Sequence, residues 1–264
     1  AIMMSYLGDQ TGVYRAMDKL GPASVEEIAK ESNVDERYLL EWLSSNSGRG
    51  YVTYHDDEEK FSLSPEQAAV FARENEPTCI QGLVQGVVGQ FVKEDIAVDV
   101  FQTGRGRPWG EHHECCFCGT ERFFRPAYAG HLLDEWIPAM EGVEDKLKKG
   151  AKVADIGCGL GTSSMLMAEQ YPNSTIHAFD FHGPSIDEAK KRAAEKGLDN
   201  LEFFVSDAAA IPNESYDLAC IFDAWHDMGD PVGVAKSIKD TLADDGTFMV
   251  VEPMALDGLK NNIE

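Results

Sequence analysis

The second half of the chain alternates short apolar runs with amphipathic stretches. The runs are four to seven residues long and end at polar residues, while the stretches between them repeat apolar positions at helical spacing. Strands that alternate with helices predict a parallel, doubly wound sheet, an α/β fold of the Rossmann-like class. We expect strands at 152–155, 175–180, 201–206, 217–223 and 247–252, and helices at 163–170, 184–196 and 231–242.

The first 75 residues carry the pattern of a small helical unit that ends in a hairpin. Ser24 followed by Glu27 is a capping box and predicts the start of a helix. A helix-turn-helix followed by a hairpin predicts a winged helix. We expect helices at 25–31 and 36–44 and a hairpin of strands at 50–54 and 60–63.

A connecting region separates these two patterns. Gly82, Gly86 and Gly89 lie in an apolar stretch and indicate either close helix packing or loosened helices. Further on, Leu132 and Trp136 recur at helical spacing. The domains that we expect are a winged-helix domain at 1–75, a helical connector or lid at 76–148 and a core domain at 149–264.

Composition and charge limit the kinds of molecule that this protein is expected to bind. Hydrophobic residues make up 43% of the 264 residues, as in ordinary globular proteins, but the formal net charge is −23. This charge argues against duplex nucleic acid and anionic membranes, and the predicted recognition helix at 36–44 carries one arginine against two glutamates. No apolar run is as long as a membrane span, no signal peptide opens the chain, and the six cysteines lack paired spacing. We therefore expect a cytoplasmic protein whose winged helix serves dimerisation or covers a substrate.

A glycine-rich turn follows the first strand of the predicted core. Asp155 closes the strand, and Gly157, Gly159 and Gly161 precede a helix whose free N–H groups point back at the turn. Such a turn lets a ligand approach bare backbone. The dinucleotide fingerprint needs its third glycine at position 162, where this chain has Thr162, which disfavours a nicotinamide cofactor.

Acidic residues follow the next strands. Ligands of such sheets bind beyond the carboxyl ends of the strands. Asp180 can accept two hydrogen bonds from a ribose diol, and Asp207 with the N–H of Ala208 can pair with an adenine ring. The fourth strand ends in Phe222 and leads to His226. A single loop aspartate is more often a helix cap or a solvated residue, but carboxylates at successive strand ends indicate a site.

These residues resemble those of class I S-adenosyl-L-methionine (SAM) methyltransferases, with motif I at 155–161. The whole chain is similar to methyltransferases with an N-terminal winged helix, including a bacterial type with the phrase found here at 119–126. The resemblance implies that the glycine turn passes the methionine end of SAM, that Asp180 holds the ribose and that Phe181 flanks the adenine. It also implies a terminal strand hairpin that this chain lacks after its fifth strand, and hence a core that is incomplete at its C-terminus. The implied cofactor-binding residues are Asp155, Gly157, Cys158, Gly159, Asp180, Phe181, Asp207, Ala208 and Phe222.

His226 is the candidate catalytic residue. An oxygen or nitrogen acceptor often needs a proton removed, and a histidine suits that task near neutral pH. His226 followed by Asp227 resembles the histidine base of plant winged-helix O-methyltransferases. A histidine that lines the pocket without transferring a proton is the alternative.

A second set of reactive side chains lies at 112–118. His112, His113, Cys115, Cys116 and Cys118 could bind zinc or a thiophilic metalloid, but their spacing fits neither a Cys-x-x-Cys nor a helical His pair. Buried thiols that pack as small apolar groups are the alternative. We expect that the sulfurs do not converge and that the chain has no metal site.

Together these features predict a SAM-dependent methyltransferase that transfers a methyl group to a small-molecule acceptor and forms a homodimer. Two alternatives stay open: a SAM-binding or DNA-binding winged-helix regulator without catalysis, and an NAD-dependent oxidoreductase. The sequence leaves open whether the acceptor atom is oxygen, nitrogen, sulfur or carbon.

Overall fold

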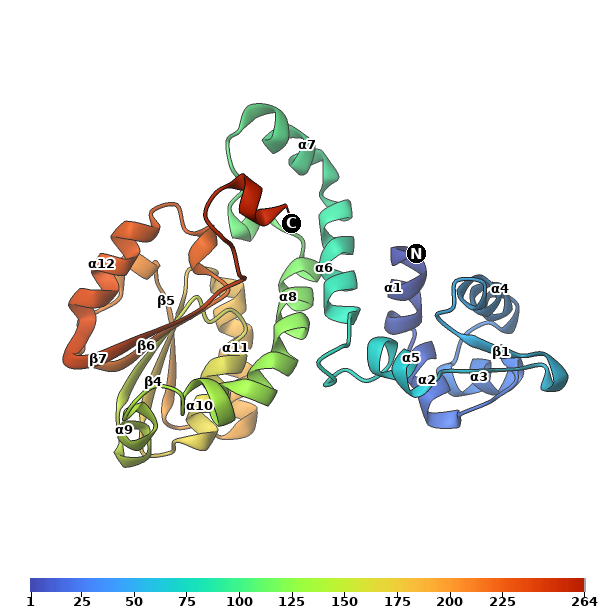
Figure 1. The fold of residues 1–264 in the computed structure, drawn as a ribbon, viewed down its shortest axis with the longest axis horizontal. Coiled ribbons are helices and arrows are strands. Elements are labelled where there is room, and N and C mark those ends of the chain that lie inside the picture. Colours follow the sequence, from blue (N-terminus) through green and yellow to red (C-terminus); the bar gives the residue numbers. More distant parts are fainter. Residues whose placement is uncertain (264) are drawn as a thin grey trace. The chain divides into compact units, whose positions relative to one another are not determined.

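The computed structural model describes residues 1–263 and divides them into two compact units. The first unit is Ala1–Ala127, and the second begins at Tyr128 (Figure 1). The segment 76–148, which we expected to form a connector, is therefore shared between the two units.

The first unit begins with the winged helix that the sequence predicts. Ser24 and Glu27 form both hydrogen bonds of the capping box at the start of the third helix. The predicted hairpin is antiparallel, and its strands are shorter than expected. The elements are α1 (Ile2–Gln10), α2 (Val13–Leu20), α3 (Val25–Ser32), α4 (Glu36–Ser47), β1 (Thr53–His55), η1 (Asp56–Glu58), β2 (Lys60–Ser62) and α5 (Pro65–Phe71).

Four further helical segments complete this unit: α6 (Gln81–Val92), α7 (Glu94–Thr103), η2 (Trp109–Glu111) and α8 (Glu114–Ala127). The two longest, α6 and α8, touch backbone to backbone. A Cβ atom on Gly82 would lie 2.4 Å from the backbone nitrogen of Phe123, and one on Gly119 would lie 2.4 Å from that of Gly86. Of the two interpretations of these glycines, close helix packing is confirmed.

A cluster of charges around Arg122 joins α8 to the winged helix. The guanidinium donates two hydrogen bonds to Asp9 of α1, at 2.9 and 3.0 Å, and two to Glu74, at 2.6 and 2.7 Å. Asp9 is buried; burial acts to raise its pKa, but the bonds to Arg122 outweigh this and hold the pKa below its ordinary value. Because bidentate pairs fix orientation as well as distance, the cluster holds α8 in a defined position against α1 of the winged helix.

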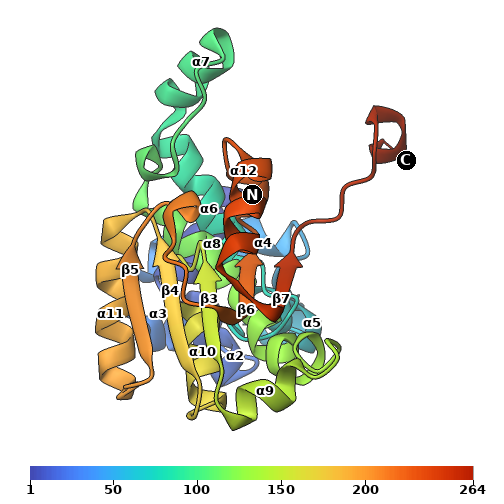
Figure 2. The same ribbon diagram turned by 90° about the vertical axis from the view of Figure 1, so that its left-hand side faces the viewer.

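The second unit is a five-stranded parallel sheet with the strand order β5-β4-β3-β6-β7 (Figure 2). This confirms the predicted α/β class. The last strand is longer than the predicted 247–252, and beyond it the described residues contain one short helix and no further strand. The elements are η3 (Tyr128–Trp136), α9 (Val143–Lys149), β3 (Lys152–Ile156), α10 (Thr162–Gln170), β4 (Thr175–Asp180), α11 (Gly183–Lys196), β5 (Leu201–Val205), η4 (Ala208–Ala210), β6 (Tyr216–Phe222), η5 (Trp225–Asp227), α12 (Pro231–Thr241), β7 (Leu242–Val251) and η6 (Leu259–Asn262).

Both faces of this sheet are buried, each under its own apolar cluster. Val153 of β3 joins residues of η3, α9, α10 and α11 on one face. Its neighbour Ala154 joins Val234 and Ile238 of α12 on the other. Because successive side chains alternate between faces and all strands are parallel, the strand ends that carry polar residues lie at one edge of the sheet.

Candidate active site

The glycine turn between β3 and α10 opens the site. Gly157, Gly159 and Gly161 all have positive φ angles, of 74, 53 and 78°, which other residues rarely adopt. A Cβ atom on Gly161 would lie 2.7 Å from the ring of Phe203, whereas one on Gly159 would meet nothing within 4 Å. Gly161 is thus required for packing, and Gly159 exposes bare backbone to open space.

Asp155 lies under this turn and is fully buried. Its Oδ2 accepts hydrogen bonds from the hydroxyls of Ser163 and Ser164, at 2.6 and 2.5 Å, while its Oδ1 has no partner. Burial raises the pKa of this carboxyl to about 6. A buried acceptor without a partner is costly, so Oδ1 is suited to a hydrogen-bond donor that a ligand brings.

Asp180, at the end of β4, fixes the turn from the side. Its Oδ2 accepts the N–H of Gly159 at 2.9 Å, and its Oδ1 accepts the N–H of His182 at 2.8 Å. Each carboxylate oxygen can accept a second bond, so capacity for a diol is left. Phe181, the next residue, is 56% exposed and offers an aromatic face. The structure therefore brings Asp155, Gly159 and Asp180 together.

The remaining predicted cofactor residues differ in exposure. Asp207 caps η4 by accepting the N–H of Ala209 at 2.8 Å, and Ala208 begins that helical turn. Cys158 and Phe222 are buried instead. Burial raises the pKa of the Cys158 thiol well above its ordinary value, so this residue is a neutral thiol.

Phe222 contacts aromatic residues of η3. Its ring centroid lies 5.4 Å from that of Tyr128 and 6.4 Å from that of Trp136. Tyr128 and Trp136 both pack against the apolar cluster on that face of the sheet. A cofactor role for Phe222 thus stays a prediction, while its contribution to the core follows directly from these contacts.

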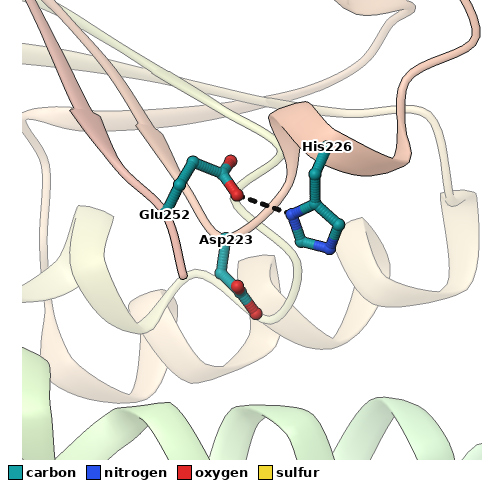
Figure 3. Close-up of side chains that lie close together, drawn as sticks. All are labelled: Asp223, His226 and Glu252. Carbon is teal, nitrogen blue, oxygen red and sulfur yellow. Dashed lines mark hydrogen bonds and ion pairs between the residues drawn. The ribbon is translucent and has the colours of Figure 1, made fainter. Parts of the chain in front are cut away.

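His226 lies in η5, just past β6, and Glu252 at the end of β7 holds it (Figure 3). The ring Nδ1 and Oε2 of Glu252 are 2.5 Å apart. Oε1 of the same carboxylate accepts the backbone N–H groups of Ala224 and Trp225, at 3.1 and 2.7 Å. One carboxylate therefore fixes both the loop and the ring. The ring is half exposed, and its Nε2 lies 3.7 Å from Oδ1 of the exposed Asp227.

Asp223 completes this group. It has a φ angle of 51°, in the left-handed region, and its Oδ1 is buried without a hydrogen-bond partner. Burial raises the pKa of Asp223 to about 6. The hydrogen bond to Glu252, with smaller contributions from the nearby acids, raises the pKa of His226 above its ordinary value.

Sequence reasoning did not assign a role to Glu252 or Asp223. Both occupy positions where that reasoning looked for ligand-binding residues, directly after strands β6 and β7. Their positions after predicted strands could therefore have identified both residues as candidates for the site. The hydrogen bond between Glu252 and His226 joins residues 26 positions apart in the chain, a contact that no local sequence pattern reveals.

The cysteines at 115, 116 and 118 lie on α8, in the first unit. Cys116 is buried, and its sulfur lies 3.5 Å from Nε2 of Gln90, whereas the sulfur of Cys115 lies 3.8 Å from the hydroxyl of Tyr6. Among residues 1–263, one group of three or more potential metal-ligating side chains gathers closely, and it is Asp223, His226 and Glu252 rather than these thiols.

Two family models match this chain. Residues 147–264 match a model described as a methyltransferase domain, and residues 1–73 match one described as an Rv2258c-like winged HTH domain. The chain carries a methyltransferase domain. The winged helix-turn-helix domain precedes it, as the sequence predicts.

Curated methyltransferases show similarity over part of their length. Sterol 24-C-methyltransferase erg-4 of Neurospora crassa is 29% identical over 175 residues, which cover 64% of this chain and 43% of that protein. Aklanonic acid methyltransferase DauC of Streptomyces sp. strain C5 is 32% identical over 108 residues, 40% of this chain and 49% of that protein. The matched regions thus span less than half of these relatives.

Solved structures of methyltransferases share the fold of this chain over nearly its whole length. Mitomycin 7-O-methyltransferase MmcR aligns with a TM-score of 0.70 at 15% identity, covering 99% of this chain and 79% of that one. Human N-acetylserotonin methyltransferase, solved in complex with SAM, aligns with a TM-score of 0.71 at 15% identity, covering 99% and 80%. Among the helices formed by residues 1–263, none is both long enough and apolar enough to cross a membrane.

Proposed function

We propose that this chain is a SAM-dependent methyltransferase that acts on a small molecule. The observation that carries the proposal is the bare turn at Gly159, which Asp180 holds beside the buried Asp155 within a methyltransferase domain. Similar proteins support the substrate class, since the names of DauC and MmcR each refer to a small-molecule acceptor.

The residues around the turn fit SAM. Asp155 offers a buried acceptor oxygen without a partner, Asp180 retains acceptor capacity for ribose hydroxyls, and Phe181 offers an exposed ring beside an adenine. Asp207 and Ala208 follow the next strand and are suited to the adenine edge. When bound, SAM supplies an electrophilic methyl group on a sulfonium, a leaving group that needs no protonation.

His226 then serves as the proton acceptor for the substrate. Glu252 takes the hydrogen bond from Nδ1–H, which leaves Nε2 unprotonated and able to accept a proton from a hydroxyl or amine. Because Glu252 also binds the backbone of the loop, ring and loop move as one piece. The chain thus contributes alignment and a base, the two contributions that methyl transfer can use.

Ligand binding to the full chain tests this proposal. We expect SAM and its demethylated product to raise the melting temperature and to bind in calorimetry, and NAD to do neither. Radiolabelled SAM, incubated with small-molecule extracts, should then label an acceptor that mass spectrometry identifies. Binding of NAD without binding of SAM would favour the oxidoreductase and end the proposal.

We also propose a homodimer. Helix α7 buries no residue, and its Val98 and Phe101 are 51 and 93% exposed, next to exposed Phe91 and Val92 of α6. Exposed apolar patches of this kind commonly mark protein interfaces. Light scattering of the full chain should give twice the 29.1 kDa chain mass, and Phe101→Asp with Val98→Asp should reduce it to one chain. A monomeric starting protein contradicts this.

We propose that the protein acts in the cytoplasm. All six cysteines are free thiols in the structure, as is usual in a reducing compartment. Fractionation of the source cells followed by immunodetection tests this, and recovery with the secreted proteins would contradict it.

A further inference from the structure

We propose that Asp223, His226 and Glu252 form a binding site for one divalent transition-metal ion. One nitrogen and two carboxylate oxygens, one from each residue, lie within 4.8 Å of one another (Figure 3). They come from separate points of the chain, the end of β6, the η5 turn and the end of β7. This site goes beyond the proposed methyl transfer and does not depend on it.

The distances suit a small ion after minor side-chain rotation. Ligand bonds of about 2.1 Å place neighbouring ligand atoms about 3 Å apart and opposite ones about 4.2 Å apart. The Nδ1 atom of His226 and Oε2 of Glu252 are 2.5 Å apart, and the largest separation in the group is below 4.8 Å. Rotations that change each separation by about half an ångström would bring all three atoms into range.

The donor set selects the kind of ion. An imidazole with two carboxylates suits Mn²⁺, Fe²⁺, Co²⁺ or Zn²⁺, whereas Mg²⁺ and Ca²⁺ prefer oxygen ligands alone. Three protein ligands on a half-exposed site leave coordination positions for water.

Two observations show that these ligands are held in place. The other oxygen of Glu252 accepts two backbone N–H groups, which is the kind of outer support that orients a ligating carboxylate. The backbone N–H of Asp223 donates a hydrogen bond to the carbonyl oxygen of Val251, at 2.8 Å, and the residue adopts a left-handed backbone conformation. Its buried Oδ1 has no partner, and a cation would supply one.

The ion takes the place of a proton. If Nδ1 binds the metal, the proton between Nδ1 and Oε2 of Glu252 leaves to solvent and Nε2 takes up a proton from solvent, so that the neutral ring carries its single proton on Nε2. In that form His226 no longer has an unprotonated nitrogen. Metal-bound and proton-accepting forms of His226 therefore exclude each other, so the ion would inhibit any reaction that uses this base.

Manganese binding to the full chain, stripped with a chelator, tests the site. The loss of the electron paramagnetic resonance signal of free Mn²⁺ should give one ion per chain. Asp223→Asn and Glu252→Gln should each weaken binding about tenfold or more. Asn tolerates the left-handed backbone, so the Asp223→Asn variant keeps the local fold. The matched control is Asp227→Asn, which removes an exposed carboxylate 3.7 Å from Nε2 and should change affinity less than about twofold.

Cobalt separates this site from the thiols. Co²⁺ bound by imidazole and carboxylates gives weak visible bands without the strong near-ultraviolet absorption of thiolate ligation. A variant with Cys115→Ser, Cys116→Ser and Cys118→Ser should leave this spectrum unchanged. Calorimetry with SAM on the same variants reports whether the methyltransferase proposal holds independently. Unchanged Mn²⁺ affinity in Asp223→Asn and Glu252→Gln, loss of binding in Asp227→Asn, or dependence on the cysteines would each overturn the proposal.

Discussion

Single carboxylates carry much of the organisation at the carboxyl edge of the sheet. Asp180 holds the backbone of Gly159, and Glu252 holds both a loop and the ring of His226. The position of Asp180 could be predicted, because a strand pattern and its end are local features of the sequence. The part played by Glu252 could not, because it requires β7 to pair with β6, which is a long-range contact.

Replacing Asp180 tests the cofactor site. We expect Asp180→Ala to weaken SAM about 10- to 150-fold, since a charge-assisted hydrogen bond contributes roughly 1.5–3 kcal/mol. The same change removes the hydrogen bond that Asp180 accepts from the N–H of Gly159. The loss of SAM affinity therefore has two sources, the missing bond to the ribose and the loosened glycine turn. Asp199→Ala, an exposed aspartate before β5, is the matched control and should bind SAM normally in calorimetry. Equal affinity of both variants would remove Asp180 from the site.

The pH dependence of turnover tests His226. A base must be unprotonated, so turnover should rise with pH through the pKa of His226, which Glu252 raises above 6.5. His226→Ala should lower turnover by about 10²- to 10⁴-fold and leave SAM affinity near wild type. A thiol or metalloid acceptor, which is easily deprotonated, would instead leave His226→Ala active. In that case the cysteines at 115, 116 and 118 become the residues to replace.

Glu252→Gln separates positioning from chemistry. The carboxamide can still accept the N–H groups of the loop, but its NH₂ faces Nδ1 and favours the tautomer with the proton on Nε2. We expect lower turnover and an acid limb of the pH profile that moves to lower pH, because the cause of the raised pKa is removed. An unshifted limb would show that Glu252 does not set the pKa of the catalytic group.

At the scale of elements, periodic patterns located the helices and strands but not their irregularities. The capping box of α3 and the parallel strands follow local rules. The helix expected around Leu132 is instead the wide π-type helix η3, two residues after Pro126 inside α8. Proline removes a backbone donor and disturbs the preceding turn, but how the chain accommodates this depends on packing that the sequence does not display.

The contact between α6 and α8 yields a stability prediction with its own control. Gly82→Ala and Gly119→Ala should each destabilise the protein by about 1–3 kcal/mol, because the added methyl group meets backbone atoms that cannot move independently. A Cβ atom on Gly86 would meet nothing within 4 Å, so Gly86→Ala should be neutral or stabilising by up to about 1 kcal/mol. Urea unfolding of the three variants measures this, and equal midpoints would contradict the close packing.

At the scale of the whole molecule, the net charge of −23 determines how the protein interacts with a polyanion such as DNA. Helix α4, the recognition helix of the winged helix, exposes Glu36 and Glu41, and its single arginine, Arg37, lies 3.8 Å from Glu41. A phosphate backbone would therefore meet acids and a cation already engaged in an ion pair.

We accordingly expect no binding to duplex DNA at physiological salt. A gel-shift titration with unrelated duplexes measures this, and a shift that weakens as salt rises would favour the regulator instead. A variant with Glu36→Lys and Glu41→Lys serves as the positive control. It should acquire weak, salt-sensitive binding if acidity is what prevents contact.

The Arg122 cluster has a consequence for how such chains can be recombined during evolution. The winged HTH match ends at residue 73. The guanidinium that neutralises the buried Asp9 nevertheless belongs to Arg122 of α8, which lies beyond the end of that match and 113 positions after Asp9 in the chain. A gene fusion that joined residues 1–73 to a foreign enzyme would remove Arg122 and leave Asp9 with one remaining cation, the half-exposed Arg15, 3.2 Å from its Oδ1. The buried carboxylate would then be less well neutralised, which destabilises the winged helix. Exchange after Ala127, where the two compact units divide, keeps every member of the cluster. The module that can be inherited intact is therefore longer than the one that sequence similarity delimits.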